Sequence, residues 1–171
     1  MRDGGLKHRD YSVEEYLGSS EVEPEIVVLD NVITQTDVDE YQNIINFKEH
    51  EIEDLAERCL EQITSNHLEL KQYAGHPIFD VKVIHYKHDE YPVPLHGTDD
   101  DIVVMCNFTK GWKHHWGGEV IFYENSEPSE IVTSFPGRVI AVSNACAWKV
   151  TQPNIKAEQN LLYLTFKVKK Q

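Results

Sequence analysis

Residues 114–150, HHWGGEVIFYENSEPSEIVTSFPGRVIAVSNACAWKV, decide the fold of this chain. Short runs of β-branched and aromatic residues alternate here with turn-forming residues, which predicts β-strands separated by tight turns. An aromatic-glycine corner, WGGE at residues 116–119, stands near one end of the stretch, and a second corner, FPGR at residues 135–138, lies in its middle. The stretch therefore indicates a sheet-rich domain organised around these two corners.

The pattern of short strands continues on both sides of this stretch. Strands are predicted at residues 25–30, 79–86, 102–107, 119–123, 130–135, 138–143, 147–151 and 160–168. Residues 91–96 contain two prolines and are predicted to form an edge strand or an extended lead-in. The run at 102–107 is apolar almost throughout, so we expect its strand to be buried on both faces. Alternation in the strand at 79–86 predicts one shared face for a set of four residues, Phe79, Val81, Val83 and His85.

Two helices are predicted near the beginning of the chain. Thr34 and Asp37 form a capping-box-like start, and apolar residues follow at helical spacing to about residue 45. A second helix is predicted from apolar residues at i, i+3, i+4, i+7, i+8 and i+11, namely Ile52, Leu55, Ala56, Cys59, Leu60 and Ile63. Eight or nine strands with these helices indicate an α+β, mainly β domain, a sandwich or barrel with its N-terminal helices packed on one sheet.

The composition fits one folded domain. The chain has 171 residues, of which 40% are hydrophobic, enough for a substantial core. Residues 1–23 are polar and charged and are predicted to be a tail, which leaves a single domain at residues 24–171. The cysteines Cys59, Cys106 and Cys146 show no CxxC spacing, so we expect buried free thiols and no disulfide scaffold or structural zinc site.

The charge balance excludes several classes of partner. The formal net charge is −13 at pH 7, which repels phosphate backbones and anionic membranes. We therefore expect neither a nucleic acid nor a membrane as a partner. The sequence has no apolar N-terminal stretch and no apolar run of bilayer-spanning length, so we expect a cytoplasmic protein.

Histidine and acidic residues near strand ends are the candidates for chemistry, because the GxGxxG, GxxxxGK[ST], GxSxG and HExxH motifs are absent. His96 opens a turn that leads to Asp99, and a histidine followed closely by a carboxylate, with a second histidine downstream, can build a facial iron site. The alternative is that residues 99–101, DDD, form a solvated acidic turn. His114 and His115 are adjacent, so at most one of them would face a pocket on an extended strand.

At this point the motifs resemble a known family. Three segments carry the resemblance: VIHYKHDEYPVPLH at residues 83–96, IVVMCNFTKGWKHHWGGEVIFYE at 102–124 and FPGRVIAVSNACAWKV at 135–150. Together they resemble the prolyl-4-hydroxylase-like branch of the 2-oxoglutarate/Fe(II) dioxygenases over roughly residues 24–168. The resemblance implies a double-stranded β-helix, or jelly-roll, core of about eight strands with helices against the major sheet. It also implies Fe(II) and 2-oxoglutarate as cofactor and cosubstrate.

The positions that the resemblance assigns to iron ligands are degenerate. His96 fits the first ligand, but the acidic position two residues later is Thr98, and Asp99 comes one residue late. A bulge after His96, which Gly97 makes feasible, would be needed for Asp99 to reach a metal. The position of the distal histidine holds Trp148, whose indole has an N–H donor and no lone pair for a metal. Trp148 would instead fill the old metal pocket or act as a plain core residue.

The positions assigned to the cosubstrate are also altered. The resemblance places Tyr86 in the cosubstrate region, at the end of the family's tyrosine-bearing strand. The family's basic residue, which pairs with the distal carboxylate of the cosubstrate, falls here on Glu158, Gln159 and Asn160. A negative charge at Glu158 would repel a dicarboxylate. A carboxylate, an imidazole and a cation are therefore all replaced.

Three functions are consistent with these residues. The first hypothesis is a 2-oxoglutarate/Fe(II)-oxygenase-like protein that has lost catalysis, needs no cofactor and acts as a binding or regulatory protein. The alternative is an active hydroxylase of a peptide or small molecule, dependent on Fe(II) and 2-oxoglutarate, with a rearranged site made of His96, Asp99 and either His115 or Glu119. The third is a structural component of a larger assembly, since a fold does not determine a function.

A binding role would need an accessible surface. Trp112, His114, His115 and Trp116 are predicted to form an exposed aromatic and basic rim around the barrel mouth, although Trp116 also suits a packing role at its corner. The partner on this hypothesis is a protein or a small molecule whose identity the sequence does not specify.

Overall fold

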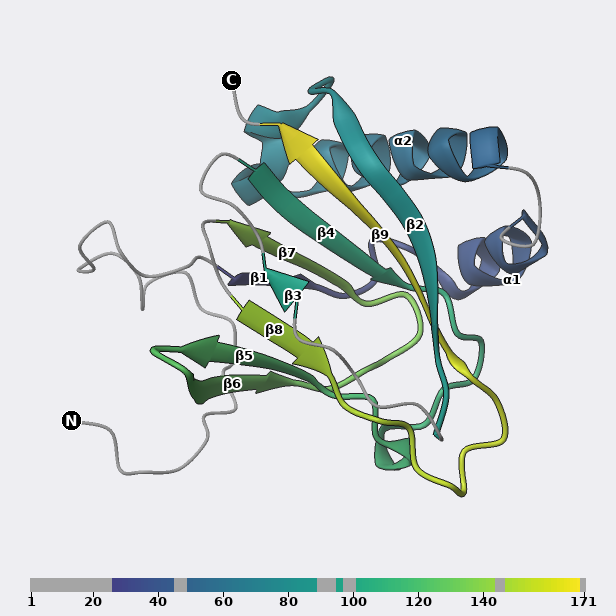
Figure 1. Ribbon diagram of the computed structural model, residues 1–171. Coiled ribbons are helices and arrows are strands. Elements are labelled where there is room, and N and C mark those ends of the chain that lie inside the picture. Colours follow the sequence, from purple (N-terminus) through teal and green to yellow (C-terminus); the bar gives the residue numbers. More distant parts are fainter. Residues whose placement is uncertain (1–25, 45–48, 89–94, 97–100, 144–146, 170–171) are drawn as a thin grey trace.

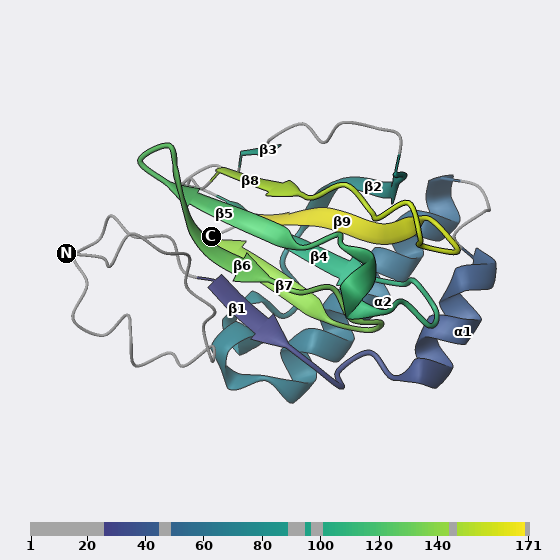
Figure 2. The same ribbon diagram turned by 90° about the horizontal axis from the view of Figure 1, so that it is seen from below.

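Two β-sheets face each other, and two α-helices cover the outer face of the larger sheet (Figures 1 and 2). A computed structural model describes residues 26–44, 49–88, 95–96, 101–143 and 147–169. Its elements are β1 (Ile26–Leu29), α1 (Gln35–Ile44), α2 (Glu49–Asn66), η2 (Leu68–Tyr73), β2 (Ile78–Tyr86), β3 (Leu95–His96), β4 (Asp101–Asn107), η3 (His114–Trp116), β5 (Val120–Glu124), β6 (Glu127–Val132), β7 (Val139–Ser143), β8 (Ala147–Val150) and β9 (Leu161–Lys169). The predicted tail at residues 1–23 and Cys146 lie outside the described residues.

The sheets form a jelly-roll. The major sheet has five strands in the order β1-β7-β4-β9-β2, and the minor sheet has four strands in the order β3-β8-β5-β6. Every pairing in both sheets is antiparallel. Apart from the β5–β6 hairpin, neighbouring strands in each sheet are not consecutive in sequence, which is the mark of a rolled-up sheet and not of a simple meander. The predicted α+β, mainly β fold with helices on one sheet is confirmed.

Strand β4 is buried on both faces, as its apolar sequence predicts. All seven of its residues are buried. Val104 and Cys106 pack into the cluster under the helices, whereas Val103 and Met105 pack between the two sheets. Strand β9 alternates in the same way, so the major sheet is a shared wall between two hydrophobic cores.

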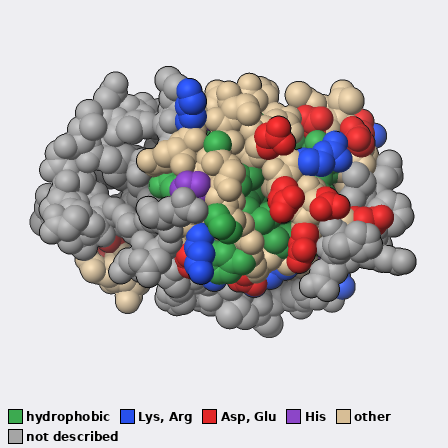
Figure 3. All heavy atoms as spheres, turned by 90° about the horizontal axis from the view of Figure 1, so that it is seen from above, with side chains coloured by type: hydrophobic (Ala, Val, Ile, Leu, Met, Phe, Trp, Pro, Cys, Tyr) green, Lys and Arg blue, Asp and Glu red, His purple; other side chains and the backbone are tan. Residues whose placement is uncertain are grey.

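The helices begin and pack as their sequence pattern predicts. The Thr34 N–H donates to Asp37 Oδ2 at 2.9 Å and the Asp37 N–H donates to Thr34 Oγ1 at 3.1 Å, a reciprocal capping box at the start of α1. On α2 the predicted apolar stripe is buried at Leu55, Ala56, Cys59, Leu60 and Ile63. Acidic side chains gather on the outer face over α2 (Figure 3). Among the described residues, no helix is long and apolar enough to cross a bilayer.

The prediction of buried free thiols is confirmed for the two cysteines that the structure describes. Cys59 on α2 and Cys106 on β4 are both buried free thiols in the core beneath the helices. The two thiols lie in contact with each other within this apolar core, and the hydrogen bond with Cys59 and burial raise the pKa of the Cys106 thiol.

Two predicted strands differ in detail. Strand β6 ends at Val132, not at residue 135, because residues 133–138 form the turn in which the Arg138 N–H donates to Phe135 O at 3.1 Å. Strand β2 has a bulge between Phe79 and Lys82, with Asp80 at φ 51°. The prediction of one shared face for Phe79 and Val81 is therefore wrong, since a bulge shifts the alternation by one residue.

The FPGR corner depends on its glycine. Gly137 has φ +81°, is buried, and its N–H donates to Asn107 O at 2.8 Å. A Cβ at Gly137 would overlap the carbonyl oxygen of Ile33. Gly111 has a similar φ of +70°, but a Cβ there meets nothing within 4 Å.

We expect Gly137→Ala to destabilise the protein much more than Gly111→Ala does. Gly111→Ala adds only the strain of a left-handed alanine, about 1–2 kcal/mol. Gly137→Ala adds steric overlap with backbone, which brings the total to roughly 3 kcal/mol or more. Urea unfolding of the two variants measures the difference. Equal losses would show that the corner can open without cost.

Candidate functional site

Trp148 lies inside the barrel, at the position where the resemblance expects a metal-binding histidine. It stands on β8, opposite Phe122 of β5 and Leu95 of β3, and is 3% exposed. Its side chain belongs to the core between the two sheets. The indole N–H has no hydrogen-bond partner among the described residues. The interior of the barrel at this point is therefore filled by a large aromatic ring that carries an unpaired donor.

The other predicted iron ligands are only partly within the described residues. The backbone of His96 lies in β3, opposite Ala147 of β8. Thr98 and Asp99 lie outside the described residues. Within the part of the chain that the structure describes, no group of three His, Cys, Asp or Glu side chains could hold a metal ion.

The structure separates His96 from the alternative ligand Glu119. The Glu119 carboxylate accepts a hydrogen bond from Thr151 Oγ1 at 2.6 Å, and the Thr151 N–H donates to Glu119 O at 2.8 Å. Thr151 comes four residues after Ala147, the partner of His96, which is about 13 Å along an extended strand. His115 is exposed in η3, beyond Glu119. The backbone positions of His96 and Glu119 are therefore well separated along the minor sheet.

Tyr86, assigned to the cosubstrate region, faces the barrel interior beside Tyr163. The two rings meet edge to face with centroids 6.1 Å apart. The Tyr163 hydroxyl lies 2.7 Å from Ser134 Oγ, which donates to Gly118 O. Burial raises the pKa of Tyr86 to about 12 and also raises the pKa of Tyr163. The tyrosine pair and Ser134 form a protonated, neutral polar cluster at neutral pH.

The sequence reasoning overlooked Tyr163 and Ser134. Alternation along β9 could have shown that Tyr163 shares a face with Leu161 and Thr165. Nothing local to Ser134 indicates that it meets Tyr163, which lies 29 residues away. The cluster is created by the closing of the barrel.

Gln159 and Asn160 lie outside the barrel, in the loop before β9. The Gln159 side-chain amide donates to Lys110 O, and Asn160 is exposed. The inward-facing residues of β9 are Leu161, Tyr163 and Thr165, which are all uncharged, and they are followed by Lys167 near the strand's end. The cations on this face of β9, Lys167 and Lys169, therefore both lie at the end of the strand farthest from Asn160.

The predicted rim of exposed aromatics is wrong for its two tryptophans. Trp112 is 3% exposed and Trp116 is 5% exposed, and their rings pack edge to face at 5.3 Å. The loop before β9 covers them, since the Asn154 N–H donates to Trp116 O at 2.5 Å. His114 and His115 are exposed, as predicted.

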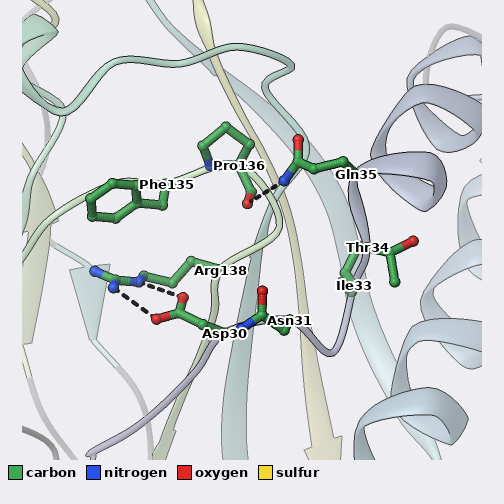
Figure 4. A pocket seen from close by; sticks show the side chains of 8 residues that line it. All are labelled: Asp30, Asn31, Ile33, Thr34, Gln35, Phe135, Pro136 and Arg138. Atoms are coloured by element: carbon green, nitrogen blue, oxygen red, sulfur yellow. Dashed lines mark hydrogen bonds and ion pairs between the residues drawn. The ribbon is translucent and has the colours of Figure 1, made fainter.

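A pocket of about 520 Å³ lies beside the FPGR corner and is here named the corner pocket (Figure 4). Its lining residues are Asp30, Asn31, Ile33, Thr34, Gln35, Phe135, Pro136 and Arg138. Arg138 donates to both Asp30 carboxylate oxygens, at 2.8 and 2.9 Å, and its guanidinium lies 4.6 Å from the centre of the Phe135 ring. Phe135 is 39% exposed and its ring stacks with that of His114 at 6.2 Å.

Comparison with solved structures identifies the fold. A prolyl 4-hydroxylase from Pseudomonas putida superposes with a TM-score of 0.59 at 13% identity, over 100% of this chain and 97% of that chain. A prolyl hydroxylase from Trichoplax adhaerens, in complex with a peptide fragment of the hypoxia inducible factor oxygen degradation domain, gives a TM-score of 0.52 at 13% identity, over 84% and 83% of the two chains. The chain has the prolyl 4-hydroxylase fold. No family model and no curated protein matches it.

The prolyl 4-hydroxylase fold agrees with the resemblance that the WGGE and FPGR stretches carry. At this identity the likeness concerns the fold alone, and the chemistry of this chain must be argued from its own side chains. Those side chains give an interior that holds Trp148 and the Tyr86–Tyr163 pair, and an outer surface with the corner pocket at the FPGR turn.

The raised pKa of Tyr86 predicts a loss of stability in strong alkali. From pH 10 to pH 12 an unfolded tyrosine loses its proton while folded Tyr86 keeps its own. The unfolded state then binds fewer protons, so the free energy of unfolding falls as the pH rises, by roughly 2–3 kcal/mol for Tyr86 at pH 12. Urea unfolding at pH 9 and pH 12 should show a smaller fall in Tyr86→Phe than in the wild type. Parallel pH profiles would mean that Tyr86 ionises freely in the fold.

Proposed function

We propose that this chain is a binding or regulatory protein that uses the prolyl 4-hydroxylase fold without 2-oxoglutarate-dependent catalysis. The observation that carries the proposal is the buried indole of Trp148 at the position assigned to the distal histidine. An indole cannot donate an electron pair to a metal, so Trp148 cannot replace the distal histidine as a ligand.

The remaining donor set does not fit iron. A facial site needs two imidazoles and a carboxylate on one side of the metal. With Trp148 in place of one imidazole, the third ligand would have to come from elsewhere. Glu119 accepts a hydrogen bond from Thr151, and Thr151 lies about 13 Å along the extended chain from Ala147, the strand partner of His96. This separation argues against the rearranged site of the alternative hydroxylase.

The end of the barrel near Asn160 is also a poor site for a dicarboxylate. Such a cosubstrate needs a cation facing into the barrel, because a buried carboxylate without a charge partner is strongly unfavourable. The inward-facing part of β9 is uncharged from Leu161 to Thr165. Arg138, which lies beside this core, is held by Asp30 and Thr133 in four hydrogen bonds. This cation is therefore engaged in holding the FPGR corner.

The surface best suited to a partner is the corner pocket with the exposed rings beside it. Its volume of about 520 Å³ is within the range of ligand sites, roughly 300–1,000 Å³. Phe135 and His114 add a stacked aromatic pair at its edge, with His115 exposed next to them. The Trichoplax adhaerens structure holds a peptide fragment, so a peptide is a reasonable class of partner for this chain. A purely structural role in an assembly would use the same surface as a contact.

We expect no binding of Fe(II) and 2-oxoglutarate. Anaerobic thermal denaturation with Fe(II) or Mn(II), with and without 2-oxoglutarate, should leave the melting temperature unchanged, because a ligand that does not bind the folded state cannot stabilise it. Trp148→His alone should release no succinate above a blank without protein, since the carboxylate and cation are also replaced.

The outcome against this proposal is a shift of several degrees that needs both additives and disappears in His96→Ala. Succinate release by the wild type would equally establish the active hydroxylase. Activity gained by Trp148→His alone would show that Thr98 and Asn160 were wrongly matched to the carboxylate and cation positions.

The corner pocket predicts a specific loss of affinity. Peptides selected on the wild-type protein from a random display library should bind Phe135→Ala at least tenfold more weakly, about 1.4 kcal/mol. Ile155→Ala is the matched control and should leave the affinity unchanged, since Ile155 is 79% exposed and lies in the loop before β9, away from the corner pocket. Fluorescence anisotropy of labelled peptides measures both variants. An equal affinity for Phe135→Ala and the wild type would exclude the corner pocket as the binding surface.

A further inference from the structure

A small cavity of about 60 Å³ lies at the opposite end of the barrel from the corner pocket and is here named the mouth cavity. Its lining includes Asp80 and Lys82 from β2, Trp148 from β8, and Thr165 and Lys167 from β9, with Val103 of β4 beneath them. The space is several times what one water molecule needs, which is roughly 10–15 Å³. It is large enough for a group of a few heavy atoms and too small for a drug-sized ligand.

A strained bulge shapes this cavity. Asp80 has φ 51° at the register shift between Phe79 and Lys82, a conformation that costs a non-glycine residue free energy. The Asp80 carboxylate lies 3.6 Å from Lys82 Nζ and 3.3 Å from Lys167 Nζ. The bulge thus brings one carboxylate between two ammonium groups at the edge of the cavity. Backbone strain of this kind is often found at functional sites.

Two buried polar atoms in the lining have no partner. Trp148 is 3% exposed and Thr165 is 5% exposed, and neither Trp148 Nε1 nor Thr165 Oγ1 has a hydrogen-bond partner among the described residues. Buried polar groups are nearly always paired in folded proteins. An indole N–H can only donate, and a threonine hydroxyl can donate as well. The missing partner of this pair is therefore a hydrogen-bond acceptor.

The local charge selects the kind of acceptor. Two lysines and one aspartate leave a net charge of about +1 at the mouth cavity, on a chain whose formal charge is −13. The Lys167 side chain is only 24% exposed, so its ammonium group is less screened than that of a surface lysine. A cation beside two donors favours a negatively charged acceptor with several oxygens.

We propose that the mouth cavity binds a small oxyanion, a carboxylate or a phosphate, between the Trp148 indole N–H, the Thr165 hydroxyl and the Lys167 ammonium group. This inference goes beyond the proposed function, because it assigns a ligand class to a site away from the corner pocket. It also gives Trp148 a role besides filling space. The anion is either a free small molecule or the acidic group of a larger ligand that enters from this end.

Titration followed by ¹H–¹⁵N correlation spectra tests the site directly. The chain has three tryptophans, and Trp148→Phe identifies which indole N–H signal belongs to Trp148. Sodium acetate and inorganic phosphate are added separately in the presence of EDTA, with sodium chloride at matched ionic strength as the reference. We expect a saturable shift of the Trp148 indole signal with at least one of the two anions, while the Trp112 and Trp116 signals stay in place.

Variants separate a built site from general charge effects. Lys167→Gln and Thr165→Val should each weaken anion binding at least fivefold, because both residues line the cavity. Lys149→Gln should leave anion binding unchanged. Lys149 does not line the cavity, and its Nζ lies 5.9 Å from the centre of the Tyr123 ring. Circular dichroism confirms that each variant is folded. The proposal is overturned if neither anion gives a saturable shift, or if Lys167→Gln and Thr165→Val bind as the wild type does.

The two proposals fail independently. EDTA removes any contribution from a bound metal to the anion titration. The test of catalysis instead measures the melting temperature with Fe(II) and the release of succinate. A saturable anion shift together with succinate release would retain the mouth cavity and overturn the loss of catalysis.

Discussion

Burial of the major sheet on both faces is the constraint on which this structure depends. Strand β4 has no solvent-facing side, and each fully buried aliphatic side chain contributes about 1.5–3 kcal/mol relative to exposure. One face needs helices α1 and α2, and the other needs the minor sheet, because neither face can be left in water. The helices, the minor sheet and the connections between them follow from this requirement.

The same constraint makes the interior of the barrel hydrophobic and keeps its polar features near the ends. At one end, Arg138 bonds Asp30 after β1 and the Gln35 side chain of α1 donates to Pro136 O, and these contacts with the FPGR turn shape the corner pocket. At the other end, the bulge at Asp80 places its carboxylate between Lys82 and Lys167 at the mouth cavity. Between these ends, the buried hydroxyl of Tyr163 forms a hydrogen bond with Ser134. The fold thus offers two chemically different pockets.

The prolyl 4-hydroxylase fold of this chain does not by itself require prolyl hydroxylase chemistry. The pairing of sheets depends on apolar alternation and on turns, which this sequence retains in its WGGE and FPGR stretches. Metal chemistry depends on a few side chains that contribute little to the core. At Trp148 a residue that packs into the core stands where the resemblance expects a metal ligand, and the sheets close around it without a metal-binding side chain at that position.

Most of the local structure was determined by the sequence. The capping box at Thr34 and Asp37, the apolar stripe of α2 and the doubly buried run of β4 each depend on neighbours within a few residues, and each was predicted. The tertiary structure alone decided the rest. Trp112 and Trp116 lie in a polar segment of the sequence. They are buried because the loop that contains Asn154, which is distant in sequence, packs over them.

The same holds for the candidate sites. Arg138 meets Asp30 across 108 residues, and Lys167 meets Asp80 across a bulge that no local alternation reveals. Local patterns fix which residues form a strand and which face is apolar, since these depend on short-range periodicity. Register between distant strands depends on how the whole sheet closes. The contacts that define the corner pocket and the mouth cavity were therefore settled by tertiary structure.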